Sequence, residues 1–185
     1  MKLGFKYSWS EIDQLTDTWQ KLAEENQGES KTIVIGDGTY RRFELKIPFS
    51  EGEILFVTDE CKPLKISYGF KNASGYEFLI YPEDFMDRVL KHFGQKEIIT
   101  GDEEFDKKYF IKGNDELLVK SVLSSSLRNY LLENNISNFK LENTDGCEKL
   151  ELILVINELD YSTMNRMLDL FKKTIHIILS TTPHS

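Results

Sequence analysis

The sequence predicts an α+β fold, in which an antiparallel β-meander sheet is covered by helices. Five strand-like segments follow one another between residues 32 and 80 with short loops between them, which is typical of antiparallel neighbours. Helical patterns flank this run without a regular strand–helix alternation, which argues against a doubly wound sheet. Apolar residues make up 40% of the 185 residues and charged residues 29%, the composition of a folded globular protein.

The first expected element is a helix over residues 9–26. Ser8 and Glu11 have the spacing of a capping box, which marks a helix start. The stripe that follows is apolar at helical spacing and contains Ile12, Leu15, Trp19, Leu22 and Ala23. Because the opposite side is charged, this stripe must find a partner surface within the fold.

Five strands are expected next. The first, Thr32–Ile35, is β-branched and precedes Asp37-Gly38, a dipeptide that favours a two-residue hairpin turn. The other four segments either are apolar at alternate positions or form a short apolar run. These segments are Phe43–Phe49, Ile54–Val57, Leu64–Phe70 and Tyr76–Ile80. Alternation predicts one buried and one wet face. We expect their aromatic residues to fill the core, with a small-molecule pocket as the alternative.

The middle of the chain combines helical and strand signals. Pro82 and Gly94 bracket a helix expected over residues 82–93. Ile98-Ile99 is a candidate short strand, Gly101–Glu104 an acidic loop, and Phe105–Lys112 a weakly alternating strand.

The C-terminal half is expected to run strand–helix–helix–strand–strand–helix. Gly113 ends its first strand by permitting an unusual backbone angle, and Asn114 caps the first helix. Two strands, Phe139–Leu141 and Leu150–Ile156, flank a turn at Asn143–Gly146, and the last helix covers residues 161–179. Apolar residues on both faces predict a central place in the sheet for Leu150–Ile156. We expect a single domain over 1–185, with 1–94 and 95–185 as alternative sub-layers.

The net charge of −8 argues against several classes of function. Residues 1–94 carry 12 Lys/Arg and 16 Asp/Glu, and residues 95–185 carry 11 and 15, so neither half has the basic excess that nucleic-acid binding needs. Arg41-Arg42 beside Tyr40 is a basic–aromatic patch too small for that role. No segment has the length of a membrane span or the pattern of a signal peptide, which predicts a cytoplasmic protein. The acidic balance disfavours a membrane-surface adaptor.

Cysteines, histidines and serines give no chemical signature. Cys61 and Cys147 are expected to be reduced thiols, with a bridge or a reactive thiol as the alternative. The histidines lack partners at zinc-like spacing, so no metal site is predicted at His92, His176 or His184. The segment Gly36–Thr39 is expected to be a hairpin turn rather than a phosphate loop. The segment Ser124–Ser126 is expected to cap a helix rather than to supply a nucleophile.

Acidic side chains cluster in the loop before residue 105. Asp102, Glu103, Glu104 and Asp106 lack the ligand register of an EF-hand, so we expect a solvated acidic loop. Paired carboxylates of an enzyme are the alternative. Two further acidic pairs are given the same solvated interpretation, Asp59-Glu60 and Glu83-Asp84.

The run GDEEFDKKYFIKGNDE, from Gly101 to Glu116, resembles a segment shared by a family of uncharacterised bacterial proteins. In that family a helical segment with the pattern V…LL follows, and Val119, Val122 and Leu123 correspond to it. Leu168–Phe171 is similar to a C-terminal helix motif of the family, although other members carry a basic or Cys-bearing C-terminus. The resemblance implies kinship over most of the chain and supplies no catalytic residue.

The sequence therefore predicts a non-enzymatic cytoplasmic binding or assembly module. It names no catalytic, cofactor-binding or metal-binding residue. The partner is an unknown protein or a small ligand, and a homo-oligomer also remains open. The alternative is an enzyme that acts on a small molecule in an aromatic-lined cleft through Asp102 or Asp106.

Overall fold

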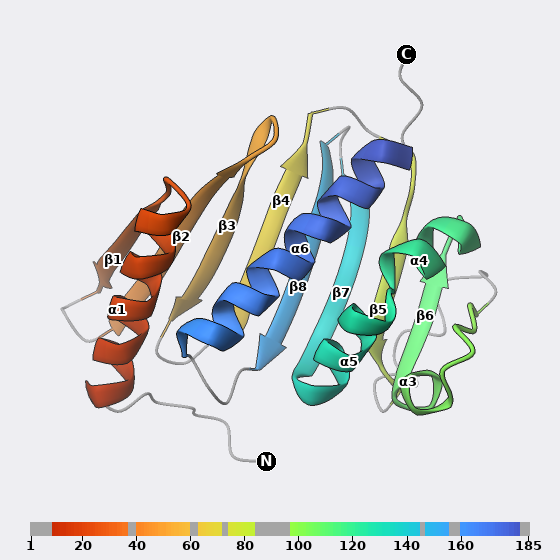
Figure 1. Ribbon diagram of the computed structural model, residues 1–185, viewed down its shortest axis with the longest axis horizontal. Coiled ribbons are helices and arrows are strands. Elements are labelled where there is room, and N and C mark those ends of the chain that lie inside the picture. The colour runs from red at the N-terminus through yellow and green to blue at the C-terminus, as the bar shows by residue number, and fades with distance from the viewer. Residues whose placement is uncertain are drawn as a thin grey trace.

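One eight-stranded antiparallel sheet organises the computed structural model, which describes residues 9–36, 40–59, 63–71, 74–83, 97–144, 147–155 and 160–181 (Figure 1). The strands are β1 (Glu29–Ile35), β2 (Tyr40–Phe49), β3 (Gly52–Asp59), β4 (Leu64–Phe70), β5 (Phe78–Pro82), β6 (Tyr109–Gly113), β7 (Asn135–Thr144) and β8 (Cys147–Val155). The helices are α1 (Trp9–Glu25), α3 (Glu103–Lys108), α4 (Glu116–Val122), α5 (Ser125–Glu133) and α6 (Tyr161–Thr181). The predicted α+β class is confirmed.

The strand order is β1-β2-β3-β4-β8-β7-β5-β6, so the chain does not form one five-stranded meander. The expectation holds for β1 to β4 and is wrong for β5. β8 lies beside β4 instead, with Leu64 opposite Leu154. The central position predicted for β8 is confirmed. A strand with apolar residues on both faces buries more apolar surface when it has a neighbouring strand on each side. Strands from both halves of the chain thus share one sheet.

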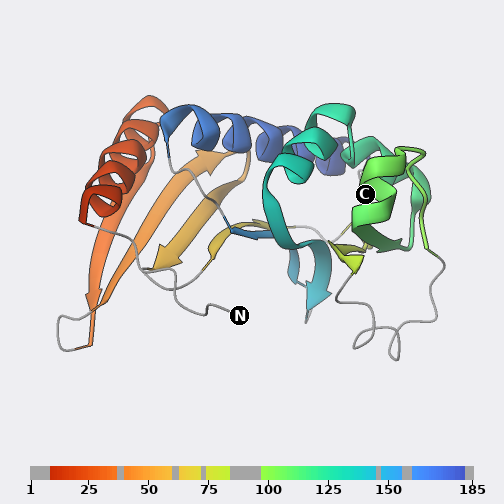
Figure 2. The ribbon, with the colours of Figure 1, turned by 90° about the horizontal axis from the view of Figure 1, so that it is seen from below.

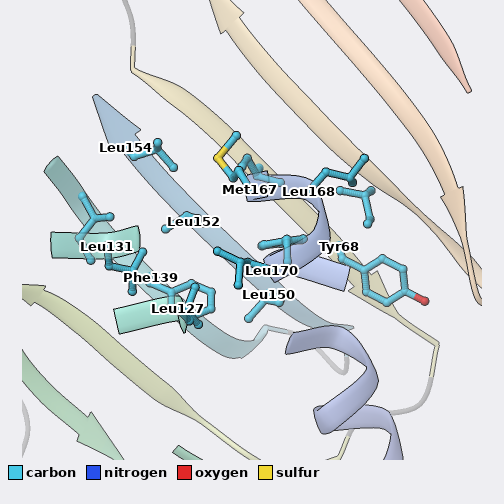
Figure 3. Close-up of a cluster of buried hydrophobic side chains, with 14 of the residues drawn as sticks. Tyr68, Leu127, Leu131, Phe139, Leu150, Leu152, Leu154, Met167, Leu168 and Leu170 are labelled. Atoms are coloured by element: carbon cyan, nitrogen blue, oxygen red, sulfur yellow. The ribbon is translucent and has the colours of Figure 1, made fainter. Parts of the chain in front are cut away.

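The helices α1, α4, α5 and α6 lie on one face of the sheet, as Figure 2 shows from below. α1 packs on β1 and β2, and α6 crosses β4, β8 and β7 (Figure 1). We call the opposite face, which carries none of the described helices, the open face. The core between sheet and helices includes leucines of β8, residues of α6 and residues of α5 (Figure 3), namely Leu150, Leu152, Leu154, Met167, Leu168, Leu127 and Leu131.

Residues 103–108 form a helix, α3, rather than an acidic loop followed by a strand. The Asp102 side chain accepts a hydrogen bond of 3.2 Å from the amide of Phe105, which caps the first turn. Acidic residues occupy the first turn, and Lys107 and Lys108 occupy the last turn. The charges at both ends therefore interact favourably with the helix dipole. A strand begins only at Tyr109.

The cap of α4 is Asp115, not Asn114. The Asp115 carboxylate accepts from the Leu118 amide at 2.8 Å. Asn114 instead bridges to the start of β5, where it accepts from the Glu77 amide at 2.9 Å and donates to the Gly75 carbonyl at 2.7 Å. Gly113 also differs from expectation, because its φ lies outside the left-handed region. A side chain there would meet Val119 at 2.9 Å, so close packing requires the glycine.

Several expectations concern single boundaries. β1 begins at Glu29, three residues before the expected start, and Pro82 ends β5 rather than beginning a helix. Ile98-Ile99 is not a strand, although Ile98 bonds to β6. Several features lie wholly or partly outside the described residues: the cap at Ser8, the turn at Asp37-Gly38, the acidic residues Glu60 and Asp84, the helix over residues 82–93, the turn that includes residues 145–146, and Ile156.

Candidate functional site

The two edge strands of the sheet, β6 and β1, differ in how far they are buried. At one edge, β6 is buried: Tyr109 and Ile111 are 1% exposed and Lys112 is 2% exposed. The amide of Ile98 donates a hydrogen bond of 2.9 Å to the carbonyl of Ile111, so the segment before α3 covers this strand. Covering an edge in this way prevents pairing with another chain.

At the other edge, β1 is exposed along almost its whole length, with only Ser30 half-buried. Within the described residues β1 pairs with β2 alone. An antiparallel edge strand presents unpaired amide and carbonyl groups toward solvent on its outer side. β1 is therefore a template on which a further strand can form.

The outer end of β1 and β2 is also apolar. Of the described residues, six large apolar side chains are exposed, and four of them gather here. Their exposed fractions are 40% for Ile33, 61% for Val34, 41% for Ile35 and 52% for Tyr40. We call these four residues the arm patch. Figure 2 shows that this end of β1 and β2 projects away from α1. Exposed apolar groups gathered at one place mark an interaction surface more than scattered ones do.

Charged residues occupy the inner half of the same strand. Lys31 and Glu29 form an exposed ion pair of 3.1 Å. On β2, Arg42 lies beside Ile33 and is held by Glu44 at 2.8 Å. Charges on an edge strand discourage pairing with another strand. The charged half of β1, Glu29–Lys31, is therefore less suited to strand pairing than the apolar half, Ile33–Ile35.

The open face carries a buried carboxylate between three lysines. Glu151 of β8 has only 7% of its side chain exposed, and its oxygens lie 2.6 Å from Lys65, 3.2 Å from Lys149 and 3.8 Å from Lys140. Burial raises the pKa of Glu151, but the hydrogen bonds from Lys65 and Lys149 outweigh burial and hold the pKa below its usual value. This network ties three adjacent strands together, since Lys65 belongs to β4 and Lys140 to β7.

A shallow groove adjoins this network between β5, β6 and β7. Its volume is about 240 Å³, and its lining includes Leu79, Lys112, Lys140 and Glu142. Lys140 is engaged by Glu142 at 2.6 Å. Pockets for small molecules usually begin at roughly 300 Å³ and enclose most of the ligand, so the groove is small for such a role.

The structure places the carboxylates singled out in the sequence in local structural bonds. Besides capping α3, Asp102 accepts from the guanidinium of Arg128 at 3.0 Å. Asp106 accepts from the hydroxyl of Thr100 at 2.7 Å and from the Gly101 amide at 2.9 Å. The amide of Phe105, followed by Arg128, lowers the pKa of Asp102. These bonds fasten α3 to α5 and to the segment before it.

Other candidate residues are spread over the fold. Cys147 is a free, exposed thiol and His176 is exposed on α6, whereas Cys61, His92 and His184 lie outside the described residues. Ser124 caps α5 as expected. The strand aromatics contribute to the core or pack against it, namely Phe43, Phe49, Tyr68, Phe70, Tyr76 and Phe78. Within the described ranges, no group of three or more His, Cys, Asp or Glu residues could hold a metal ion.

The sequence patterns include all four residues of the arm patch, but in other roles. Sequence reasoning noted Tyr40 beside the two arginines and the β-branched run Thr32–Ile35. It did not foresee that this run is an edge with both faces exposed. Edge position depends on the order of distant strands, and the local sequence carries no direct signal for it.

Comparisons with known proteins show the fold. No protein-family model matches the chain, and no curated protein matches it. It is similar to the crystal structure of the mycobacterial trehalose monomycolate transport factor A, TtfA, with a TM-score of 0.55 and 7% sequence identity over 92% of this chain and 97% of that one. Among the described helices, none has both the length and the apolar character needed to cross a membrane.

Proposed function

We propose that this chain is a non-enzymatic binding or assembly module that recognises a protein partner by strand addition at β1. In strand addition, an extended segment pairs with a free sheet edge through main-chain hydrogen bonds, and side-chain contacts give specificity. The observation that carries the proposal is the contrast between the covered edge at β6 and the exposed, apolar edge at β1. A cytoplasmic location remains a prediction from the sequence, which cell fractionation checks.

Two further features support binding over catalysis. Asp102 and Asp106, the carboxylates of the enzymatic alternative, are engaged by Arg128 and by the segment at Thr100. The groove on the open face is small and its Lys140 is already paired with Glu142. The side chains of the arm patch, in contrast, are 40–61% exposed.

The test is capture of protein partners by the tagged full chain in cells, compared across matched variants. Val34→Lys places a charge at the centre of the arm patch, and Leu117→Lys places one at another exposed apolar residue, 79% exposed on α4. We expect Val34→Lys to lose the partners that the wild type retains and Leu117→Lys to keep them. Equal capture by all three proteins, or no partner for the wild type, would contradict the proposal. Unfolding curves establish that both variants are folded.

A further inference from the structure

The chemistry of the free half of β1 is self-complementary. Ile33, Val34 and Ile35 are three consecutive β-branched residues, and pairing of two antiparallel copies about a two-fold axis sets such a run against itself. A two-fold axis through Val34 places Val34 opposite Val34 of a second copy and each Ile33 opposite Ile35 of that copy. Every apolar residue of the edge then faces another apolar residue.

Other axes give poorer contacts. A two-fold axis through Thr32 sets Lys31 opposite Ile33 and leaves Val34 opposite Ser30. An axis through Ile33 sets Lys31 opposite Ile35. Of these three axes, the one through Val34 leaves both Glu29 and Lys31 outside the apolar pairs, so their ion pair of 3.1 Å is kept. The charged half of β1 thus selects the register.

The neighbouring strand β2 fits this arrangement. Arg42 lies beside Ile33 and Tyr40 beside Ile35 within each copy. With the axis through Val34, side chains on the open face form rows that run across both copies. Each row contains Arg42 and Ile33 of one copy, followed by Ile35 and Tyr40 of the second copy. Like charges do not face one another directly in these rows, and each tyrosine ring flanks the apolar pair.

We propose that the β1 edge pairs with β1 of a second copy of this chain, antiparallel and centred on Val34, to form a weak reversible dimer with one continuous sheet. The inference rests on the proposed function and names one partner for the same edge. The interface is small, and each apolar cross-strand pair contributes only about 0.2–1 kcal/mol. Since each copy carries a net charge of −8, added salt screens the repulsion and strengthens the dimer.

A cysteine scan tests the register directly. Thr32→Cys, Ile33→Cys and Val34→Cys are made in a Cys61→Ser, Cys147→Ser background, with Leu117→Cys as the control. Residues on the axis face each other with Cα atoms ~4.5–5.5 Å apart, within the range a disulfide spans. We expect Val34→Cys to form a covalent dimer under mild oxidation about tenfold or more faster than the control. Faster cross-linking of Thr32→Cys or Ile33→Cys overturns the register.

Sedimentation of the protein with its natural cysteines tests the dimer itself. We expect a concentration-dependent dimer that salt strengthens, and self-association about tenfold or more weaker in Val34→Lys. A wild type that stays monomeric up to millimolar concentration overturns the inference. If that monomer still captures other proteins through β1, the proposed function stands without self-pairing; if Val34→Lys also captures partners as well as the wild type, both fail.

Discussion

The amide of Ile98 lies 2.9 Å from the carbonyl oxygen of Ile111 and closes the outer edge of β6. At the far side of the same sheet, β1 has no described neighbour beyond it. Natural sheets usually protect their edges because a free edge pairs with other chains. The described sheet therefore has one covered edge and one exposed edge with β-branched residues, and the proposed strand addition rests on this difference.

Two buried tyrosines provide a matched test of the hydrogen bonding beneath the helices. Tyr109 donates to the carbonyl of Leu131 at 2.8 Å, and burial raises its pKa to about 12. The Tyr130 hydroxyl is equally buried and has no hydrogen-bond partner among the described residues. We expect Tyr109→Phe to lower the free energy of unfolding by about 1–2 kcal/mol and Tyr130→Phe to be neutral or stabilising. Urea unfolding of both variants is the measurement, and equal losses would show that the bond contributes nothing.

Gly113 is expected to be intolerant of a side chain. A Cβ atom there would lie 2.9 Å from Val119 and 3.0 Å from the carbonyl oxygen of Glu77. Gly113→Ala should therefore reduce the free energy of unfolding by about 1–3 kcal/mol through overpacking. Gly69 on β4 has open space around it, so Gly69→Ala should gain up to roughly 1 kcal/mol. Thermal unfolding of the two variants distinguishes them, and a neutral Gly113→Ala would contradict the close contact.

Removing the charge of Glu151 should destabilise the sheet. We expect Glu151→Gln to cost about 1–3 kcal/mol at neutral pH, because three lysines lose the negative charge that they share. Glu53→Gln, in an exposed pair 3.4 Å from Lys46, should change stability by about 0–1 kcal/mol.

The pH dependence of the Glu151 effect has a defined sign. Because the folded pKa lies below the usual 4.5, the stabilisation is present above that value and is lost as pH falls through the folded pKa. The gap between wild type and Glu151→Gln should therefore shrink in acid. A gap independent of pH would contradict the role of the charge, and chemical unfolding at a series of pH values measures it.

The start of α6 depends on Asp160. Its carboxylate accepts from the Ser162 amide at 2.8 Å and from the Thr163 amide at 3.1 Å. Hydrogen bonds from the hydroxyls of Ser162 and Thr163 are the main cause that lowers its pKa to about 2. Asp160→Ala should cost about 0.5–2 kcal/mol, whereas Asp17→Ala on the exposed side of α1 should be nearly neutral. The contribution should persist down to the usual pKa of 3.8 and vanish as pH falls through about 2. A loss as large for Asp17→Ala in denaturant unfolding would contradict it.

Much of the fold follows from local pattern, and the rest depends on contacts between distant segments. The apolar stripe beginning at Ile12 predicts α1, and alternation in Phe43–Phe49 predicts β2. The short helix α3 has too few residues for a period, and its cap at Asp102 is its main signal. The displacement of β5 by β8 cannot be deduced from loop length, because strand order is decided by which strand buries both faces. The local sequence does not reveal the exposure of the arm patch for the same reason.

Amide hydrogen exchange, compared between the purified free protein and its complex with a captured partner or a second copy, tests the open β1 edge most directly. Strand addition at β1 predicts rapid exchange in the free protein of those amides within Ile33–Ile35 that do not bond to β2, marked slowing of the same amides in the complex, and no change at Tyr109–Gly113 of the covered edge. Unchanged exchange along β1, with slowing confined to another surface, would contradict recognition through this edge.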